Sequence, residues 1–208
     1  MEKYETPESH LNLIKHILYF ITDLLDKHNI KYFIDGGTLL GAIRNKDIIK
    51  HDDDADIGIL YKDFFCKLPS IYNEIKNHKV IINDVEYYLN IDNKYPTLTK
   101  IFIQGLWGKS DYGKIIGTPT IDIFCWQSKN DIIELYCPKQ RKQFKNCYYK
   151  KSEMFPLTKW EFGNKNLYGA NNPLGYLFRY YGNDCLKVIK VDMRLEEHCL
   201  NKISESIN

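Results

Sequence analysis

Apolar residues in the first third of the chain follow two different spacings. From Leu11 to Leu25 they recur every three or four positions, and Thr6-Pro7-Glu8 supplies a capping hydroxyl, a proline at the first helical position and an acid. This pattern predicts an amphipathic helix over residues 6–29. Residues 30–35 (IKYFID) are typical of a short strand, which the pair Gly36-Gly37 ends, and residues 38–44 (TLLGAIR) predict a short helix.

Further along the chain, most patterns predict strands. Alternation and then an apolar run over residues 54–61 predict a half-buried strand, followed by a helical stretch over 62–77 that Pro69 interrupts. Strands are expected at 79–83, 85–91, 97–104 and 119–126. The glycine-rich segment 105–118 is expected to be a mobile loop, and helices are expected at 173–182 and 184–203.

This order of elements predicts an α+β fold with a mixed β-sheet flanked by helices and a helical C-terminal segment. We expect a single domain over residues 1–208, with an N-terminal helix at 6–29, a catalytic core at 30–126 and a helical segment at 150–205. The length of 208 residues and the 44% hydrophobic content are sufficient for one core without a metal or disulfide staple.

Charge and signal patterns narrow the class of protein. The net charge of +2 is not typical of a nucleic-acid binder, so no nucleic-acid partner is expected. The basic run at 139–151 is more typical of a solvated loop or strand edge than of a polyanion site. The polar start of the chain and the absence of about 18 consecutive apolar residues predict a cytoplasmic protein with no intrinsic membrane span.

The six cysteines are scattered without a CxxC pair, which favours reduced, mostly buried thiols. A zinc site that includes Cys137 and Cys147 is the less favoured alternative.

An aspartate cluster is the main chemical signal. Asp52, Asp53, Asp54 and Asp56 fall within five positions, and residues two apart on a strand point to the same side. Asp54 and Asp56 therefore form a carboxylate pair. The negative charge of each group raises the pKa of the other unless a cation lies between them. An all-oxygen site of this kind suits Mg²⁺ or Mn²⁺. A solvated turn is the alternative, which the apolar run after the aspartates disfavours.

The glycine pair adds a phosphate-binding signal. Backbone N–H groups of a glycine turn at a helix N-terminus can approach a phosphate closely. Arg44, near the end of the same short helix, would either hold phosphate oxygens or form a salt bridge to an aspartate, and the sequence favours neither. An EF-hand is excluded because Ile57 stands where the loop glycine should be, and no P-loop motif is present. The pair His51-Asp52 lacks the further clustered histidines of an HD phosphohydrolase.

The stretch GGTLLGAIR followed by HDDDADIGI resembles the signature of the LicD/fukutin family. Residues 120–124 (TIDIF) and 155–182 are similar to later family segments, so the resemblance spans roughly residues 11–182. Two departures are visible: Lys50-His51 stands where the family often has Pro-Trp, and Ala55 replaces a larger aliphatic residue.

The resemblance implies a nucleotidyltransferase-like fold and a transferase that uses a nucleotide-linked donor, most often a CDP-alcohol. Such an enzyme moves an alcohol phosphate, for example phosphocholine or ribitol phosphate, to a sugar hydroxyl of a glycan or glycolipid and releases CMP. The position-by-position match makes Asp54, Asp56 and Asp122 the metal ligands, and Asp122 also the candidate base. It places the donor phosphate on Gly36, Gly37 and Thr38.

Several assignments stay open at this stage. Lys100 is a weaker candidate phosphate contact, and Arg179 is a candidate acceptor or phosphate contact. Trp107, Trp126 and Trp160 are interpreted as core residues before any stacking role is considered. The alternatives are a nucleotidyltransferase that releases pyrophosphate, a binding domain without turnover, and a subunit that needs a partner protein.

Overall fold

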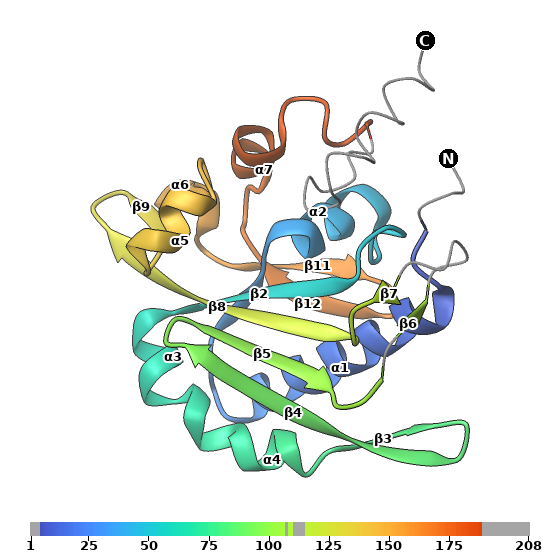
Figure 1. Cartoon of the computed structure of the whole chain (residues 1–208). Coiled ribbons are helices and arrows are strands. Elements are labelled where there is room, and N and C mark those ends of the chain that lie inside the picture. The colour runs from blue at the N-terminus through green and yellow to red at the C-terminus, as the bar shows by residue number, and fades with distance from the viewer. Residues whose placement is uncertain (1–4, 107, 110–114, 189–208) are drawn as a thin grey trace.

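The computed structural model of the chain describes residues 5–106, 108–109 and 115–188 and has an α+β architecture (Figure 1). A mixed sheet of eight strands forms its centre, with the order β1 (Tyr32–Ile34), β2 (Asp54–Leu60), β8 (Thr120–Lys129), β5 (Leu98–Ile103), β4 (Val85–Tyr95) and β3 (Lys79–Ile82). The far end of β8 also pairs with β9 (Ile132–Leu135), which pairs with β10 (Tyr148–Lys150). Strands β2 and β8 run parallel, and the other pairs of this sheet are antiparallel.

The predicted helices of the first third are confirmed. Helix α1 spans Glu8–Lys27 and buries the apolar stripe from Leu11 to Leu25, while α2 spans Gly36–Asn45 and begins directly after β1. The stretch after β2 is helical but broken near Pro69, as α3 (Tyr61–Cys66), a 3₁₀ turn (Leu68–Ile71) and α4 (Tyr72–Lys76).

The two faces of the central sheet differ in chemistry. Ile57, Ile59, Ile121 and Ile123 are fully buried, and α1 contacts both strands that carry them. Because alternate residues of a strand face opposite sides, Asp54 and Asp56 point away from α1. Burying the isoleucine face against α1 contributes roughly 2 kcal/mol per large side chain. This packing fixes the strand that carries Asp54 and Asp56 on its other face.

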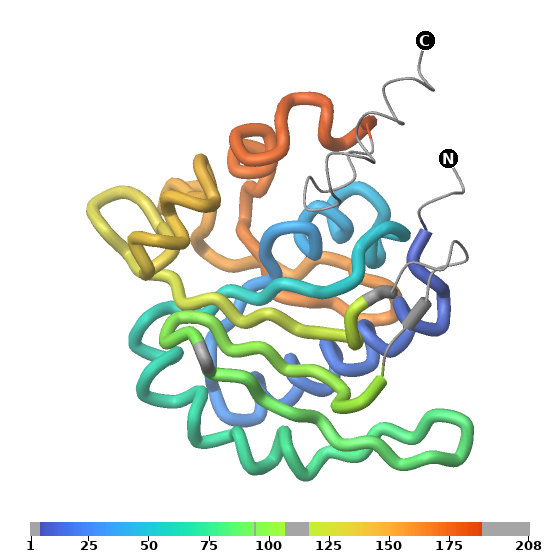
Figure 2. The backbone as a smooth tube through the Cα atoms, viewed as in Figure 1, coloured from blue at the N-terminus to red at the C-terminus, as the bar shows by residue number. Residues whose placement is uncertain are grey.

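The C-terminal third differs from the expectation of a mainly helical segment. Residues 150–169 contain the short helix α6 (Lys151–Met154) and a hairpin of β11 (Thr158–Phe162) and β12 (Lys165–Gly169), with Gly163 at φ +60° in its turn. The tube in Figure 2 shows this orange hairpin beside the blue first third of the chain, where β11 contacts α2 and β12 contacts β1. Helix α7 (Leu174–Tyr181) follows and confirms the helix predicted at 173–182.

The basic run at 139–151 and the glycine-rich segment 105–118 also differ in part from the predicted loops. The basic run contains helix α5 (Pro138–Gln143), which was not predicted, and the strand β10 (Tyr148–Lys150), which pairs only with β9 among the described strands and agrees with the expected strand edge. In the glycine-rich segment, the two-residue strands β6 (Gly108–Lys109) and β7 (Ile115–Ile116) pair with each other. The expected helix at 184–203 lies mostly outside the described residues.

Candidate active site

Two adjacent strands bring the predicted carboxylates together, and a third strand adds Lys100. In the sheet register, Asp56 of β2 stands opposite Asp122 of β8, and Lys100 of β5 stands opposite Asp122 on the other side. Asp54, two residues before Asp56, points to the same side of β2. One carboxylate oxygen from each of Asp54, Asp56 and Asp122 lies within 4.8 Å of the others. The sheet therefore places these side chains at a single point, with Lys100 beside them.

The electrostatics of this cluster favour a bound cation. Burial raises the pKa of Asp56 well above its ordinary value, and the charges of Asp54 and Asp122 raise it further. Lys100 supplies a positive charge, with its Nζ 2.5 Å from Asp122 Oδ2. The donor set consists of carboxylate oxygens, which Mg²⁺ and Mn²⁺ prefer, so the residues present fit such an ion.

The glycine pair leaves room for two carboxylates, a role that the sequence did not predict. Gly36 has φ +51°, and a Cβ there would lie 2.6 Å from Asp56 Oδ2; a Cβ at Gly37 would lie 2.5 Å from Asp52 Oδ2. A side chain at either position would therefore displace a carboxylate. The Thr38 hydroxyl accepts the Asp56 N–H at 2.8 Å and is buried. The start of α2 thus packs directly on the acidic cluster, and the expected phosphate contacts there stay a prediction.

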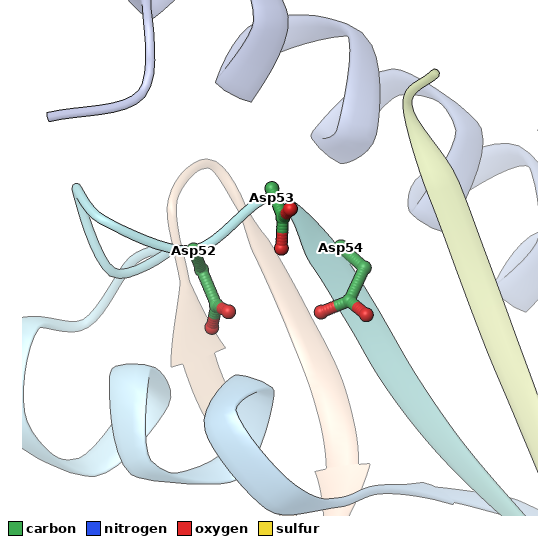
Figure 3. Close-up of side chains that lie close together, drawn as sticks. All are labelled: Asp52, Asp53 and Asp54. Atoms are coloured by element: carbon green, nitrogen blue, oxygen red, sulfur yellow. The ribbon is translucent and has the colours of Figure 1, made fainter. Parts of the chain in front are cut away.

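A second acidic group borders the first. One carboxylate oxygen from each of Asp52, Asp53 and Asp54 lies within 4.8 Å of the others, and Figure 3 shows the three side chains where the incoming loop joins β2. Asp53 is exposed, while Asp52 and Asp54 are half-buried. Asp54 belongs to both groups, so the two acidic groups form one continuous surface.

A buried hydrogen-bond network behind the site was missed by the sequence reasoning. Asp35, the residue before Gly36, accepts hydrogen bonds at its Oδ1 from Tyr149 Oη (2.6 Å) and Tyr176 Oη (2.9 Å). All three residues are buried, and burial raises the pKa of the Asp35 carboxyl. The only available sequence signal was an acid at the end of an apolar strand, because its partners lie more than 110 positions away.

Tyr181 is a further residue near the cluster that the sequence did not indicate. Its hydroxyl would lie 3.5 Å from a Cβ at Gly36, on the side of the Asp56 carboxylate. Burial raises the pKa of Tyr181, and the charge of Asp56 is the next cause. The last turn of α7 therefore delivers a hydroxyl to the edge of the acidic cluster.

The remaining predicted residues lie at the margins of the site. Arg44 donates from Nη1 to the Cys185 carbonyl (3.1 Å) and is attracted by the charge of Asp52, so it connects the end of α2 to the chain after α7. Arg179 forms an ion pair with Glu153 at 2.7 Å, which is a structural contact. Trp126 is fully buried, Trp160 is partly buried, and Trp107 lies outside the described residues.

The structure is an α+β domain in which three aspartates converge beside a glycine turn, and sequence comparison identifies its family. The family described as LicD/FKTN/FKRP, nucleotidyltransferase domain, matches residues 29–172. The chain belongs to this family, and the resemblance drawn from the signature is confirmed.

Individual relatives include enzymes of phosphate transfer. An uncharacterized protein of Rickettsia typhi is 31% identical over 183 residues, which is 87% of this chain and 49% of that protein. Human ribitol 5-phosphate transferase FKRP is 36% identical over 62 residues (30% of this chain and 12% of that one). Lipopolysaccharide cholinephosphotransferase LicD of Haemophilus influenzae is 33% identical over 72 residues (35% and 26%). Two of these relatives therefore carry names of phosphate-transferring enzymes, each matched over part of its length.

The extent of these matches is limited. The chain spans about half the length of the two Rickettsia relatives, 49% and 50%. Among solved structures, the lincomycin-bound lincosamide adenylyltransferase LnuA aligns with a TM-score of 0.47 and 14% identity over 89% of this chain and 99% of that chain. Within the described residues, the structure contains no helix that is both long enough and apolar enough to cross a bilayer.

Proposed function

We propose that this chain is the transfer domain of an enzyme that moves an alcohol phosphate from a CDP-linked donor to a sugar hydroxyl of a glycan or glycolipid, with Mg²⁺ or Mn²⁺ as cofactor. The observation that carries the proposal is the convergence of Asp54, Asp56 and Asp122 from two adjacent strands beside the start of α2. The names of the human and Haemophilus relatives support phosphate transfer of a ribitol or choline unit.

Each residue has a role that its position supports. Asp54, Asp56 and Asp122 would hold the divalent ion, which neutralises negative charge on the transferred phosphate. Lys100, which contacts Asp122, would bind a phosphate oxygen of the donor. The N–H groups at the start of α2, which packs on the same cluster, would favour an anion through the helix dipole.

The transfer itself balances without a covalent enzyme intermediate. The acceptor hydroxyl oxygen forms a bond to the phosphorus that bears the alcohol, and the bond from that phosphorus to the oxygen of CMP breaks. The hydroxyl proton passes to a carboxylate of the cluster, and Asp122 is the candidate base. A phosphodiester and CMP are the products.

The competing reaction is nucleotidyl transfer, in which a sugar or alcohol phosphate attacks the α-phosphorus of a nucleoside triphosphate and pyrophosphate leaves. The same carboxylates serve both reactions, so the products decide. We expect the purified chain with Mg²⁺ and CDP-ribitol or CDP-choline to release CMP, slowly to water and faster with a glycan acceptor, and Asp54→Asn/Asp56→Asn to abolish the release. Pyrophosphate from CTP with ribitol 5-phosphate or phosphocholine, without CMP from either CDP-alcohol, would favour the alternative.

A further inference from the structure

A surface at the far end of the central sheet has no role in the reaction described above. Trp126 of β8 stands opposite Leu60 of β2 on one side and Leu135 of β9 on the other. Helix α3 begins directly after Leu60, and helix α5 begins shortly after Leu135, so both helices lie at the same end of the sheet (Figure 1). Asp54 is the first residue of β2, so the acidic cluster lies toward the other end of that strand.

Three aromatic side chains of this surface pack against one another. The ring centroids of Tyr61 and Phe65 on α3 lie 5.1 Å apart, and the rings of Tyr61 and Tyr136 are stacked with centroids at 4.7 Å. Tyr61 and Phe65 nevertheless remain 46% and 40% exposed. Exposed apolar side chains that gather in one place, rather than singly, are typical of an interaction surface.

The basic run of the sequence begins next to these rings. Arg141 Nη1 of α5 donates to the Tyr136 carbonyl at 2.8 Å, which holds the helix beside the aromatic side chains. Lys139 and Lys142 are three positions apart on α5, so they share a face, and both are exposed. Residues 135–152 contain six basic residues and no acid. The sequence alone favoured a solvated segment here, and the structure adds the exposed rings beside it.

The acids nearest in sequence to this surface are already paired. Asp63 Oδ1 of α3 lies 3.0 Å from Lys67 Nζ, and Glu134 Oε1 of β9 lies 3.6 Å from Arg141 Nη1. The exposed lysines beside the rings are Lys62, Lys139 and Lys142. Their positive charge is therefore complementary to an anionic partner.

The combination of charge and rings favours a lipid surface over a nucleic acid. Tyrosine and phenylalanine enter the headgroup layer of a bilayer, and lysines beside them attract anionic headgroups. A nucleic-acid base would need an open ring face on which to stack. Tyr61 and Tyr136 already stack on each other, and Phe65 packs against both. The net charge of +2 is also small for a nucleic-acid binder.

We propose that this aromatic–basic surface binds the headgroup layer of an anionic lipid bilayer. The residues that form it are Tyr61, Phe65, Tyr136, Lys62, Lys139 and Lys142. The inference does not rest on the proposed function, because the surface lies toward the opposite end of β2 from the carboxylates. It adds a membrane surface as a partner of this chain.

The test measures co-sedimentation of the purified chain with sucrose-loaded vesicles. Vesicles of phosphatidylcholine are compared with vesicles that also contain about 30% phosphatidylglycerol, at about 0.1 M salt. We expect at least about tenfold stronger binding to the anionic vesicles, and a loss of this preference as the salt concentration is raised.

Lys139→Gln/Lys142→Gln tests the basic part of the surface and should weaken binding to the anionic vesicles by about tenfold. Lys76→Gln/Lys159→Gln removes the same charge from exposed positions on α4 and β11 and is the matched control. The control should change binding by less than about twofold. An equal loss in both variants would show that net charge alone attracts the chain, and would overturn the surface.

Tyr61→Ser/Phe65→Ser tests the aromatic part and should weaken binding by about fivefold, because the rings no longer enter the headgroup layer. Tyr88→Ser, at a position on β4 that is 48% exposed, is the matched control and should bind as the wild type does. Circular dichroism establishes that each variant is folded.

Titration of CDP with Mg²⁺ on the same samples separates this inference from the proposed function. Vesicle binding without metal-dependent CDP binding would support the surface and count against the proposed function. Equal binding to both kinds of vesicle, binding to neither, or binding that survives in either surface variant would overturn the surface and leave the proposed function standing. Binding of a single-stranded oligonucleotide without binding to vesicles would likewise overturn it.

Discussion

At the residue scale, Asp56 is the most constrained side chain of the candidate site. Its N–H donates to the Thr38 hydroxyl at 2.8 Å, and its carbonyl accepts the Asp35 N–H at 3.1 Å. Its carboxylate occupies the space that a side chain at Gly36 would need. These backbone contacts fix the residue in place. The free-energy cost of burying its negative charge therefore lowers the stability of the folded state unless a cation neutralises the charge.

We predict that Asp56→Asn stabilises the metal-free protein at neutral pH. Burial and neighbouring aspartates raise the pKa of Asp56 in the folded state, so ionising it opposes folding. Stability of the wild type relative to the variant should fall as pH rises above the ordinary pKa of 3.8 and level off once the raised pKa is passed. The gain at neutral pH should be about 1–2 kcal/mol, measured by urea unfolding in EDTA.

Asp53→Asn is the control for this prediction, because Asp53 is the exposed member of the neighbouring acidic group. It should change stability by less than about 0.5 kcal/mol. Equal stability of wild type and Asp56→Asn across the pH range in EDTA would show that the charge of Asp56 costs the fold nothing.

Gly36 gives a second prediction at the same scale. Gly36→Ala combines a left-handed backbone with a Cβ 2.6 Å from Asp56 Oδ2, whereas Gly105→Ala has a similar backbone (φ +79°) with nothing within 4 Å of the added Cβ. Both should lose about 1–2 kcal/mol of stability from backbone strain. Only Gly36→Ala should weaken Mn²⁺ binding by tenfold or more, measured by electron paramagnetic resonance. Equal Mn²⁺ affinity in both variants would show that a side chain at position 36 does not disturb metal binding by the aspartates.

Residue identities were the part of the site that the sequence could predict. The two-residue period of a strand placed Asp54 and Asp56 side by side, and the resemblance added Asp122. The contacts of Gly36 with Asp56 and of Gly37 with Asp52 could not be predicted, because they depend on the angle at which α2 meets β2.

At the scale of elements, Asp35 joins three parts of the chain that are distant in sequence. It lies between β1 and α2, and its carboxyl accepts hydrogen bonds from Tyr149 on β10 and Tyr176 on α7. Because Gly36 follows directly, the buried network fixes the start of α2 against the acidic cluster.

Removing either hydroxyl should therefore destabilise the fold. We predict that Tyr149→Phe and Tyr176→Phe each cost about 1–3 kcal/mol, because a buried carboxyl loses a donor. The double variant should not be additive, since both hydroxyls serve the same oxygen. Tyr72→Phe, whose hydroxyl bonds to Thr99 at 3.2 Å in a partly exposed place, should cost less than either. Guanidinium unfolding measures all four, and strict additivity would argue against one shared network.

Elements in the first half of the chain were predicted more accurately than those in the last third. Helix α1 and strands β2, β4 and β5 carry strong periodic patterns. The hairpin of β11 and β12 carries Lys159, Glu161 and Lys165 among its apolar residues and packs against α2 and β1, so tertiary contacts rather than local pattern define it.

At the scale of the whole molecule, one face of the central sheet forms the hydrophobic core and the other face carries the candidate site. The isoleucine face of the sheet packs on α1, and the opposite face carries the carboxylates, close to Gly36 of α2 and Tyr181 of α7. The chain spans about half the length of its two Rickettsia relatives.

The central claim is that Asp54, Asp56 and Asp122 hold a divalent ion that recruits a cytidine nucleotide. The most direct measurement is calorimetric titration of CDP, CMP, UDP and GDP with Mg²⁺, with Mn²⁺ and without metal, into the wild type and into Asp54→Asn/Asp56→Asn. The account predicts metal-dependent binding of CDP or CMP in preference to UDP and GDP, and its loss in a double variant that remains folded. Binding that is independent of metal, or that survives in the double variant, would contradict the account.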